Sequence, residues 1–361
     1  MKIKSLTLMA FVALFSVGVA AADRVVHVYN WSDYIAEDTL EKFTAQTGIE
    51  VVYDVFDSNE ILEAKLLAGQ SGYDVVVPTS DFLARHIQAG IYQPLDKSKL
   101  PNWQNLDTDL LNTLSTHDAG NAYGVPYQWG TTGLGYNVAK VKEILGDDAP
   151  TDSWSLLFDP SYASKLAECG ITVLDSANEV LPFALNYLGL DPNSKNTKDY
   201  KQAEALLLAI RPHINYFHSS QYIGDLANGD VCLSMGWSGD IFQAMTRAEE
   251  ADNGIEIAYT IPKEGAGMWA DMMAIPKDAP NLDAAYEFIN FVLDAQIGAD
   301  ITNYVWYGSP NKAARAFIDD EILSDPAIYP PEGAKLFSLE MMPMKITRTM
   351  TRTWSKVKSG R

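Results

Sequence analysis

Short β-branched runs alternate with amphipathic stretches along the first part of the chain after Asp23. The runs have the length of strands, and the amphipathic stretches have the 3.6-residue period of helices. Strands separated by helices of this length pair in parallel, so we expect an open sheet covered by helices on both faces. The expected strands are 25–29, 49–55 and 74–77, and the expected helices are 37–47, 59–68 and 82–89.

The pattern changes between Tyr123 and Asn137, where the chain is extended, glycine-rich and aromatic. A linker would usually be polar, whereas this segment carries aromatic residues. We interpret it as the first crossing between two lobes. A second α/β series follows, and we expect the chain to return near residue 250. The series has expected strands at 170–174, 231–236, 255–261 and 268–275, and expected helices at 179–188, 200–210 and 282–293.

These patterns predict an α/β protein of two lobes, each an open, mainly parallel sheet flanked by helices, with a hinge that the chain crosses more than once. Lobe one is expected to comprise residues 23–127 and 250–315. Lobe two is expected to comprise residues 128–249 and 316–361.

The first residues have the parts of a secretory leader. Lys2 and Lys4 precede an uncharged run of 14 residues, Leu6 to Val19, and three alanines follow it. A bilayer core needs about 20 apolar helical residues, so this run predicts a leader and not an anchor. We expect residues 1–22 to be a signal peptide that is cleaved after Ala22 during export.

The chain is strongly acidic. It has 27 Lys and Arg against 47 Asp and Glu, and loss of Lys2 and Lys4 with the leader takes the formal charge from −20 to −22. This charge disfavours binding to nucleic acid and to anionic membranes. No later stretch has 18 apolar residues in a row, so we expect no direct membrane insertion. The basic segment 345–361 is the exception, and we interpret it as a solvated helix or tail against the acidic body, without an assigned function.

The two cysteines, Cys169 and Cys232, are 63 positions apart. An oxidising compartment would let them pair, and we predict a disulfide, with two buried free thiols as the alternative.

Motifs of known enzymes are absent from the sequence. The five histidines, at positions 27, 86, 117, 213 and 218, do not have metal-ligand spacing. The sequence also lacks a nucleophile elbow, a dinucleotide fingerprint and a phosphate loop. We therefore expect no metal, no cofactor and no catalysis, with an unfamiliar periplasmic enzyme that acts on amines as the alternative from another class.

Aromatic and acidic residues follow the expected strands of both lobes. In open α/β sheets the ligand site lies beyond the carboxyl ends of the strands. One strand runs into Trp31, another into Trp237 and Asp240, and Trp269 and Asp271 point to the same side of a third. Core packing or helix capping explains each residue alone. Together they indicate a cleft with flat apolar walls and fixed negative charge.

An aliphatic cation is the ligand that complements such a cleft. An ammonium group donates three hydrogen bonds and needs a carboxylate when it leaves water, and methylene groups favour aromatic faces. Cation–π attraction adds about 0.5 to 2 kcal/mol for each well-placed ring. A sugar site would favour amides, and a ferric site would favour clustered tyrosines and histidines.

The sequence resembles the periplasmic polyamine-binding proteins of ABC importers, particularly the putrescine and spermidine receptors, over essentially the whole mature chain. Besides Tyr-Asn-Trp-Ser-Asp-Tyr at 29–34, the resemblance includes Ser-Ser-Gln-Tyr at 219–222, Asp-Leu-Ala-Asn-Gly-Asp at 225–230, Tyr-Pro-Pro at 329–331 and Trp-Ser-Lys-Val-Lys-Ser-Gly at 354–360. It implies a type II-like periplasmic binding protein fold. It also implies a monomer in the periplasm that closes over a linear polyamine and delivers it to an inner-membrane ABC permease.

The matching motifs imply eleven ligand-binding residues. Glu179 would hold one amine and Asp271 the other, Asp240 would form a charge and stacking pair with Trp237, and Asp33 would border the site. The remaining residues would form the walls, and they are Trp31, Ser32, Tyr34, Thr79, Trp269 and Tyr307.

The preference between putrescine and spermidine is open at this point. The four acids carry more charge than a diamine can neutralise, and this chain has Trp269 where many putrescine-type members carry Phe. A larger indole would either shorten the cavity or hold a longer ligand. A receptor for a basic amino acid or a sugar is the alternative among binding proteins.

Overall fold

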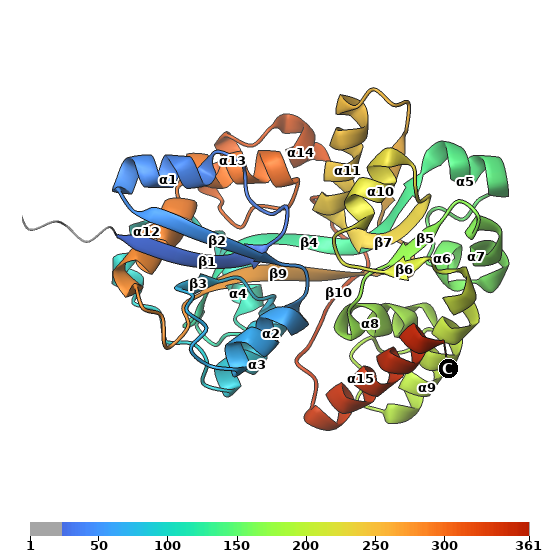
Figure 1. Ribbon diagram of the computed structural model, residues 1–361, viewed down its shortest axis with the longest axis horizontal. Helices are drawn as coiled ribbons and strands as arrows, with labels where there is room; N and C mark the ends of the chain where they lie inside the picture. The colour runs from blue at the N-terminus through green and yellow to red at the C-terminus, as the bar shows by residue number, and fades with distance from the viewer. Residues whose placement is uncertain (1–23, 361) are drawn as a thin grey trace, which may run out of the picture.

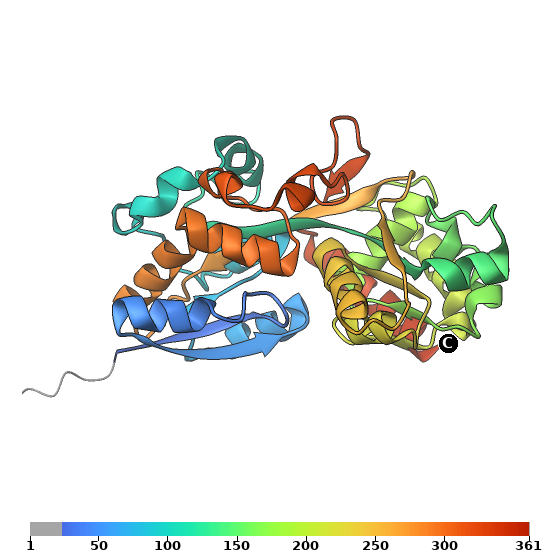
Figure 2. The same cartoon turned by 90° about the horizontal axis from the view of Figure 1, so that it is seen from above.

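A computed structural model describes residues 24–360 of the chain. The predicted leader, its cleavage after Ala22 and the last residue, Arg361, lie outside the described residues. Figures 1 and 2 show the helices and strands gathered in two groups, with the long strands β4 and β9 running between them.

The first group is built on three parallel strands. β1 (Val25–Trp31) pairs with β2 (Glu50–Phe56) on one side and with β3 (Val75–Val76) on the other. Parallel neighbours need crossover connections, and helices supply them. α1 (Thr39–Thr47) and α2 (Asn59–Leu67) make these connections. α3 (Ser80–Gln88) and α4 (Thr108–Leu114) follow β3, with 3₁₀ turns between them at Lys97–Lys99 and Pro101–Asn105.

The long strand β4 (Gly124–Asn137) leads from the first group into the second (Figure 1). Its first part pairs with β9 (Ala266–Ala274) and its last part with β7 (Leu233–Trp237), both antiparallel. β5 (Ile171–Val173) lies parallel between β7 and β6 (Tyr216–Phe217). The helices of this group are α5 (Val138–Leu145), α6 (Ser155–Phe158), α7 (Pro160–Leu166), α8 (Ala177–Tyr187), α9 (Thr197–Ile210), α10 (Tyr222–Asn228) and α11 (Ser238–Glu250), with a 3₁₀ turn at Arg211–His213.

The chain returns to the first group along β9. Before that, β8 (Ile257–Thr260) pairs with the last four residues of β4, in the second group. After β9, α12 (Leu282–Val292) packs on β1 and α1, and α13 (Ala295–Val305) follows it. The C-terminal elements are a 3₁₀ turn at Ala313–Ala316, α14 (Asp320–Ser324), β10 (Leu336–Ser338), which pairs with β9, and α15 (Met344–Ser359), which packs on α8 and α9.

The strands form one mixed sheet with the order β2-β1-β3-β9-β4-β7-β5-β6, with β10 beside β9 and β8 beside β4. Each of the two groups has its own apolar core. The first core draws on residues 26–127 and 269–307, and the second on residues 134–257 and 346–357. A smaller cluster joins α11, α13 and α14 through Phe242, Ala299 and Ile322.

The α/β class predicted from the sequence is confirmed, and each predicted strand and helix overlaps an observed one. The sheet differs from the expectation in that its two halves are continuous and that β4, β8 and β9 pair antiparallel. The lobe boundaries at 127/128, 249/250 and 315/316 stay a prediction. Because β8 pairs with the second half of β4, we propose that the second crossing is β9 and not a segment near residue 250.

Cys169 and Cys232 form the predicted disulfide, with their Cα atoms 5.5 Å apart. It connects the end of the α7 region to the start of β7, next to the backbone hydrogen bond from Cys232 to Gly170. Within residues 24–360, none of the helices has the length and apolarity needed to cross a bilayer.

Candidate functional site

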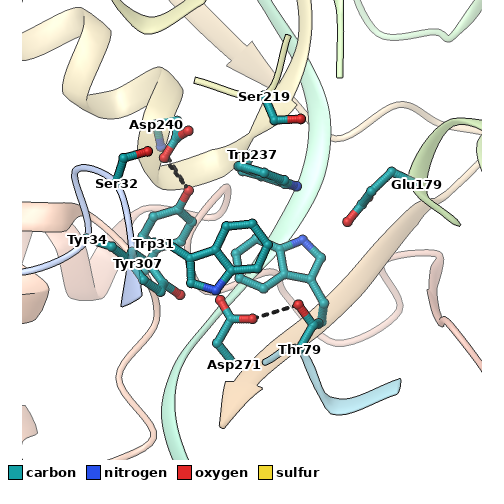
Figure 3. A pocket seen from close by; sticks show the side chains of 11 residues that line it. Trp31, Ser32, Tyr34, Thr79, Glu179, Ser219, Trp237, Asp240, Asp271 and Tyr307 are labelled. Carbon is teal, nitrogen blue, oxygen red and sulfur yellow. Dashed lines mark hydrogen bonds between the residues drawn. The ribbon is translucent and has the colours of Figure 1, made fainter. Parts of the chain in front are cut away.

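A narrow cavity lies between the two groups, at the carboxyl ends of β1, β3 and β7 (Figure 3). Its volume is about 390 Å³, including space that is open to solvent. Ten of the eleven predicted residues line it together with Ser219. The lining residues are Trp31, Ser32, Tyr34, Thr79, Glu179, Ser219, Trp237, Asp240, Trp269, Asp271 and Tyr307.

Asp271 provides the negative charge on the side of the first group. It is 3% exposed and accepts a hydrogen bond of 2.8 Å from Thr79 Oγ1, whose position Asn59 fixes with two further hydrogen bonds. The Tyr34 hydroxyl lies near this carboxylate but has no hydrogen bond of regular geometry within residues 24–360. Burial raises the pKa of Asp271 to about 7, against the hydrogen bonds that lower it.

Asp240 provides a second carboxylate, from the first turn of α11 in the second group. Two tyrosine hydroxyls donate to it at 2.7 Å, Tyr222 to Oδ2 and Tyr307 to Oδ1 (Figure 3 draws the second). Tyr307 follows α13, so this contact joins the two groups. Burial raises the pKa of Asp240 to about 7, although both hydrogen bonds favour the charged form.

Glu179 provides the third carboxylate, from the first turn of α8. Thr132 Oγ1 donates to it at 3.1 Å, and the same hydroxyl accepts a hydrogen bond from the indole of Trp269. Burial and then the charge of Asp81 raise the pKa of Glu179 to about 8. The lining thus holds three buried acids from β9, α8 and α11 and, among the described residues, no basic side chain.

Edge-to-face and tilted contacts join the aromatic side chains into one continuous wall. Trp237 lies between Trp31 and Trp269, with ring centroids 5.3 Å and 6.3 Å away. Tyr307 continues the wall, 5.5 Å from Trp269 and 5.0 Å from Tyr34. Aromatic faces of this kind contact methylene groups and attract cations. The aromatic wall and the three acids therefore line one cavity.

Gly130 on β4 makes room for this wall. It pairs with Trp269 across the sheet, and a Cβ atom at position 130 would lie 2.8 Å from the Tyr307 ring and 2.9 Å from Ser238 Oγ. In the sequence, the glycines of this segment indicated only a crossing between lobes. Their packing role depends on a strand partner that is more than 130 positions away.

Polar contacts outside the cavity lining also join the two groups. Glu60 on α2 accepts hydrogen bonds from Ser176 and Asn178, at the start of α8, at 3.1 Å and 2.9 Å. Asp33 pairs with Arg247 of α11 at 2.7 Å. His218 lies 3.8 Å from Asp57, farther than a hydrogen bond.

Asp33 is the one predicted residue that does not line the cavity. Its side chain is 38% exposed, and its backbone has a φ of 54°, a left-handed conformation that turns the chain after Trp31. The carboxylate is directed to Arg247 and not to the cavity. Ser219 is the lining residue that we did not predict, although the segment 219–222 belongs to the resemblance. It is 3% exposed and accepts a hydrogen bond from the Asp175 backbone.

Comparison with known proteins identifies the family. A family model described as bacterial extracellular solute-binding protein matches residues 38–330. The chain belongs to this family. Trp31 to Tyr34 precede the matched range, and the other residues of the cavity lie within it.

This solute-binding protein is similar to curated relatives along nearly its whole length. It is 57% identical to the putrescine-binding periplasmic protein SpuD of Pseudomonas aeruginosa, and the alignment covers 95% of this chain and 94% of SpuD. It is 53% identical to the putrescine-binding periplasmic protein PotF of Escherichia coli, with coverage of 96% and 95%.

Among solved structures, a spermidine/putrescine ABC transporter protein of Listeria monocytogenes superposes with a TM-score of 0.84 at 31% identity, over 94% of this chain and all of that one. The resemblance seen in the sequence is therefore confirmed. The curated relatives and the family are binding proteins, so this solute-binding protein is not an enzyme.

Proposed function

We propose that this protein is an exported receptor that binds a linear polyamine, putrescine or spermidine, in the cavity and delivers it to an inner-membrane ABC permease. The observation that carries the proposal is the set of three buried carboxylates, Glu179, Asp240 and Asp271, without a basic side chain in the lining. Buried acids are costly unless a cation pairs with them. The names of the relatives, which bind putrescine or spermidine, support the same ligand class.

The proposed roles follow from the position of each acid. Asp271 would hold one ammonium group on the side of the first group, and Glu179 and Asp240, from α8 and α11, would hold the remaining charge of the ligand on the side of the second. The rings of the aromatic wall would contact the methylene groups between them. Because the Tyr34 hydroxyl is buried and lacks a regular hydrogen bond, it would serve as a further acceptor for the ammonium near Asp271.

We infer that the ligand favours closure of the two groups. Only the closed arrangement brings Asp271 of one group together with Glu179 and Asp240 of the other, so a polyamine binds this arrangement more tightly than an open one. The contacts of Glu60 and Asp33 across the cavity rim would form in the same step. We propose that Asp33 supports closure and does not touch the ligand.

The proposal places the mature protein in the periplasm as a monomer, after cleavage of the leader behind Ala22. The putrescine-binding relatives are periplasmic proteins, which supports this compartment. Both polyamines stay in the proposal because the three acids of the lining match the three charges of spermidine, whereas a diamine leaves one acid to hold a proton. A neutral sugar would leave all three acids unpaired, and it is therefore disfavoured.

Calorimetric titration tests the proposal directly. Putrescine, spermidine, arginine and a neutral sugar are titrated into the purified mature protein, with tryptophan fluorescence as a second readout because three tryptophans line the cavity. We expect saturable binding of a polyamine and none of the sugar. A protein that binds arginine or the sugar and no polyamine contradicts the proposed ligand class.

A further inference from the structure

Five exposed basic residues gather on the outer face of α9 and α15. Lys198 and Lys201 are one turn apart on α9, and Lys345, Arg348 and Arg352 follow helical spacing on α15. None of the five has an ion pair within the described residues. The ion pairs of this region are made by Lys195, Lys356 and Lys358. We call these five residues the basic stripe.

Contacts between the two helices bring the parts of the stripe together. Glu204 of α9 accepts hydrogen bonds from Thr353 and Lys356 of α15, and Arg211 contacts the backbone of Lys358. The helices therefore run in the same direction. Lys201 lies one turn before Glu204 on α9, and Arg352 lies one turn before Lys356 on α15, so both cations stand close in sequence to the contact between the two helices.

The acids around the stripe are already engaged. Glu204 pairs with Lys356 at 2.8 Å, Glu340 pairs with Lys195 at 3.2 Å, and Asp199 accepts hydrogen bonds from Ser194 and Asn196. Like charges at helical spacing repel one another. A chain with 47 acidic residues nevertheless leaves these cations without a counter-charge of their own.

We propose that the basic stripe docks onto an acidic protein surface on the periplasmic side of the ABC transporter to which the receptor delivers its ligand. This inference rests on the proposed function for the identity of the partner. A protein partner fits better than an anionic membrane, because electrostatic interactions fade beyond about 8 Å at physiological salt. A local acidic patch then meets only the stripe, whereas a planar membrane also meets the acidic body of the receptor.

The stripe is connected to the rim of the cavity. Asp175 accepts hydrogen bonds from Trp354 at 2.9 Å and from Lys358 at 2.8 Å, near the C-terminal end of α15. The next residue, Ser176, donates to Glu60 of the first group across the cavity. Helix α15 therefore contacts the segment whose hydrogen bond joins the two groups, and the N-terminal part of the same helix carries Lys345, Arg348 and Arg352.

The test compares two variants with the same change of charge. The stripe variant carries Lys345→Gln, Arg348→Gln and Arg352→Gln. The control variant carries Lys165→Gln, Lys277→Gln and Lys312→Gln, at exposed positions that are far apart in the sequence. Each replaces the receptor in cells, at equal amounts, and uptake of radiolabelled putrescine and spermidine is measured at limiting receptor.

We expect uptake to fall about tenfold for the stripe variant and to change less than twofold for the control, since three surface ion pairs together contribute about that factor. Calorimetry with the purified stripe variant should give an unchanged polyamine Kd. Equal uptake by the two variants, or a weakened Kd, overturns the proposal.

A second measurement decides between the transporter and the membrane. The receptor is sedimented with vesicles of phosphatidylglycerol and phosphatidylcholine in equal amounts, at physiological salt. We expect no co-sedimentation, and binding of the wild type that the stripe variant loses would assign the stripe to lipid and refute the protein partner. If the wild type binds no polyamine in calorimetry, the proposed function fails, and that result is visible before uptake is measured.

Discussion

Replacement of Asp271 by Asn removes one buried charge from the cavity and leaves the shape of the side chain unchanged. The Asn amide oxygen can still accept the hydrogen bond from Thr79 Oγ1, which spans 2.8 Å in the wild type. Position 271 is 3% exposed, so water does not replace the lost charge. An ammonium group at this end would still lose its hydration but would no longer meet a carboxylate.

The expected loss depends on pH in a defined direction. Breaking one partner of a buried ion pair costs at least about 3 kcal/mol, or roughly a hundredfold in Kd. Burial raises the pKa of Asp271 to about 7, and a bound ammonium favours the ionised form. The contribution of Asp271 is therefore complete above that pKa and falls by about tenfold for each pH unit below it. Because Asn does not titrate, the ratio of the two Kd values should shrink from roughly a hundredfold near pH 8.5 to about tenfold near pH 6.

Calorimetry at several pH values measures this ratio with the polyamine that binds the wild type most tightly. The control is Asp148→Asn, which makes the same change of net charge at an exposed position after α5 and should alter the Kd by less than about twofold. A ratio that stays constant between these pH values would refute the role of a buried, titrating carboxylate. An equal loss in the control would refute its location in the site.

Three further predictions concern the wall, the disulfide and the protons of the site. Gly130→Ala should destabilise the closed protein and weaken binding by about 1 to 3 kcal/mol, because the new Cβ would lie 2.8 Å from the Tyr307 ring. Gly224→Ala is the control, since a Cβ at position 224 would have nothing within 4 Å and should have neither effect. Thermal unfolding with and without polyamine compares the two variants, and equal effects would contradict the packing argument. Reduction of the Cys169–Cys232 bond should lower the free energy of unfolding by about 4 kcal/mol in denaturant titrations and leave the Kd within about twofold, and a large loss of affinity would show that the bond shapes the site. Polyamine binding at about pH 7 should release protons, since a bound cation lowers the raised pKa values of the three acids, and calorimetry in buffers of different ionisation enthalpy should detect them; identical heats in all buffers would speak against this coupling.

The sequence predicted the residues of the cavity well because of where they stand relative to the strands. Trp31 and Trp237 end strands of different groups, and Asp240 lies in the first turn of α11, the helix that directly follows the strand ending at Trp237. In open α/β sheets such positions converge at one edge, so spacing along the chain was enough to bring them together. The resemblance then added Glu179 and Tyr307, which strand pattern alone ranked no higher than their neighbours.

Features that depend on distant partners were not predictable in the same way. Asp33 stands between two residues that line the cavity, but a left-handed backbone and an ion pair with Arg247, 214 positions away, direct it outward. The antiparallel pairing of β4 with β9 joins segments that the helical rhythm does not connect. Local pattern predicts which face of an element is buried, and it does not specify which remote element covers that face.

The single strand β4 has a consequence for how the protein unfolds. Its residues contribute to both apolar cores, with Val125 in the first and Leu134 in the second. Neither half can lose its core without disturbing the register that the other half shares along β4 and β9. Heating should therefore melt the whole molecule in one cooperative transition, and neither half is expected to fold when it is produced alone.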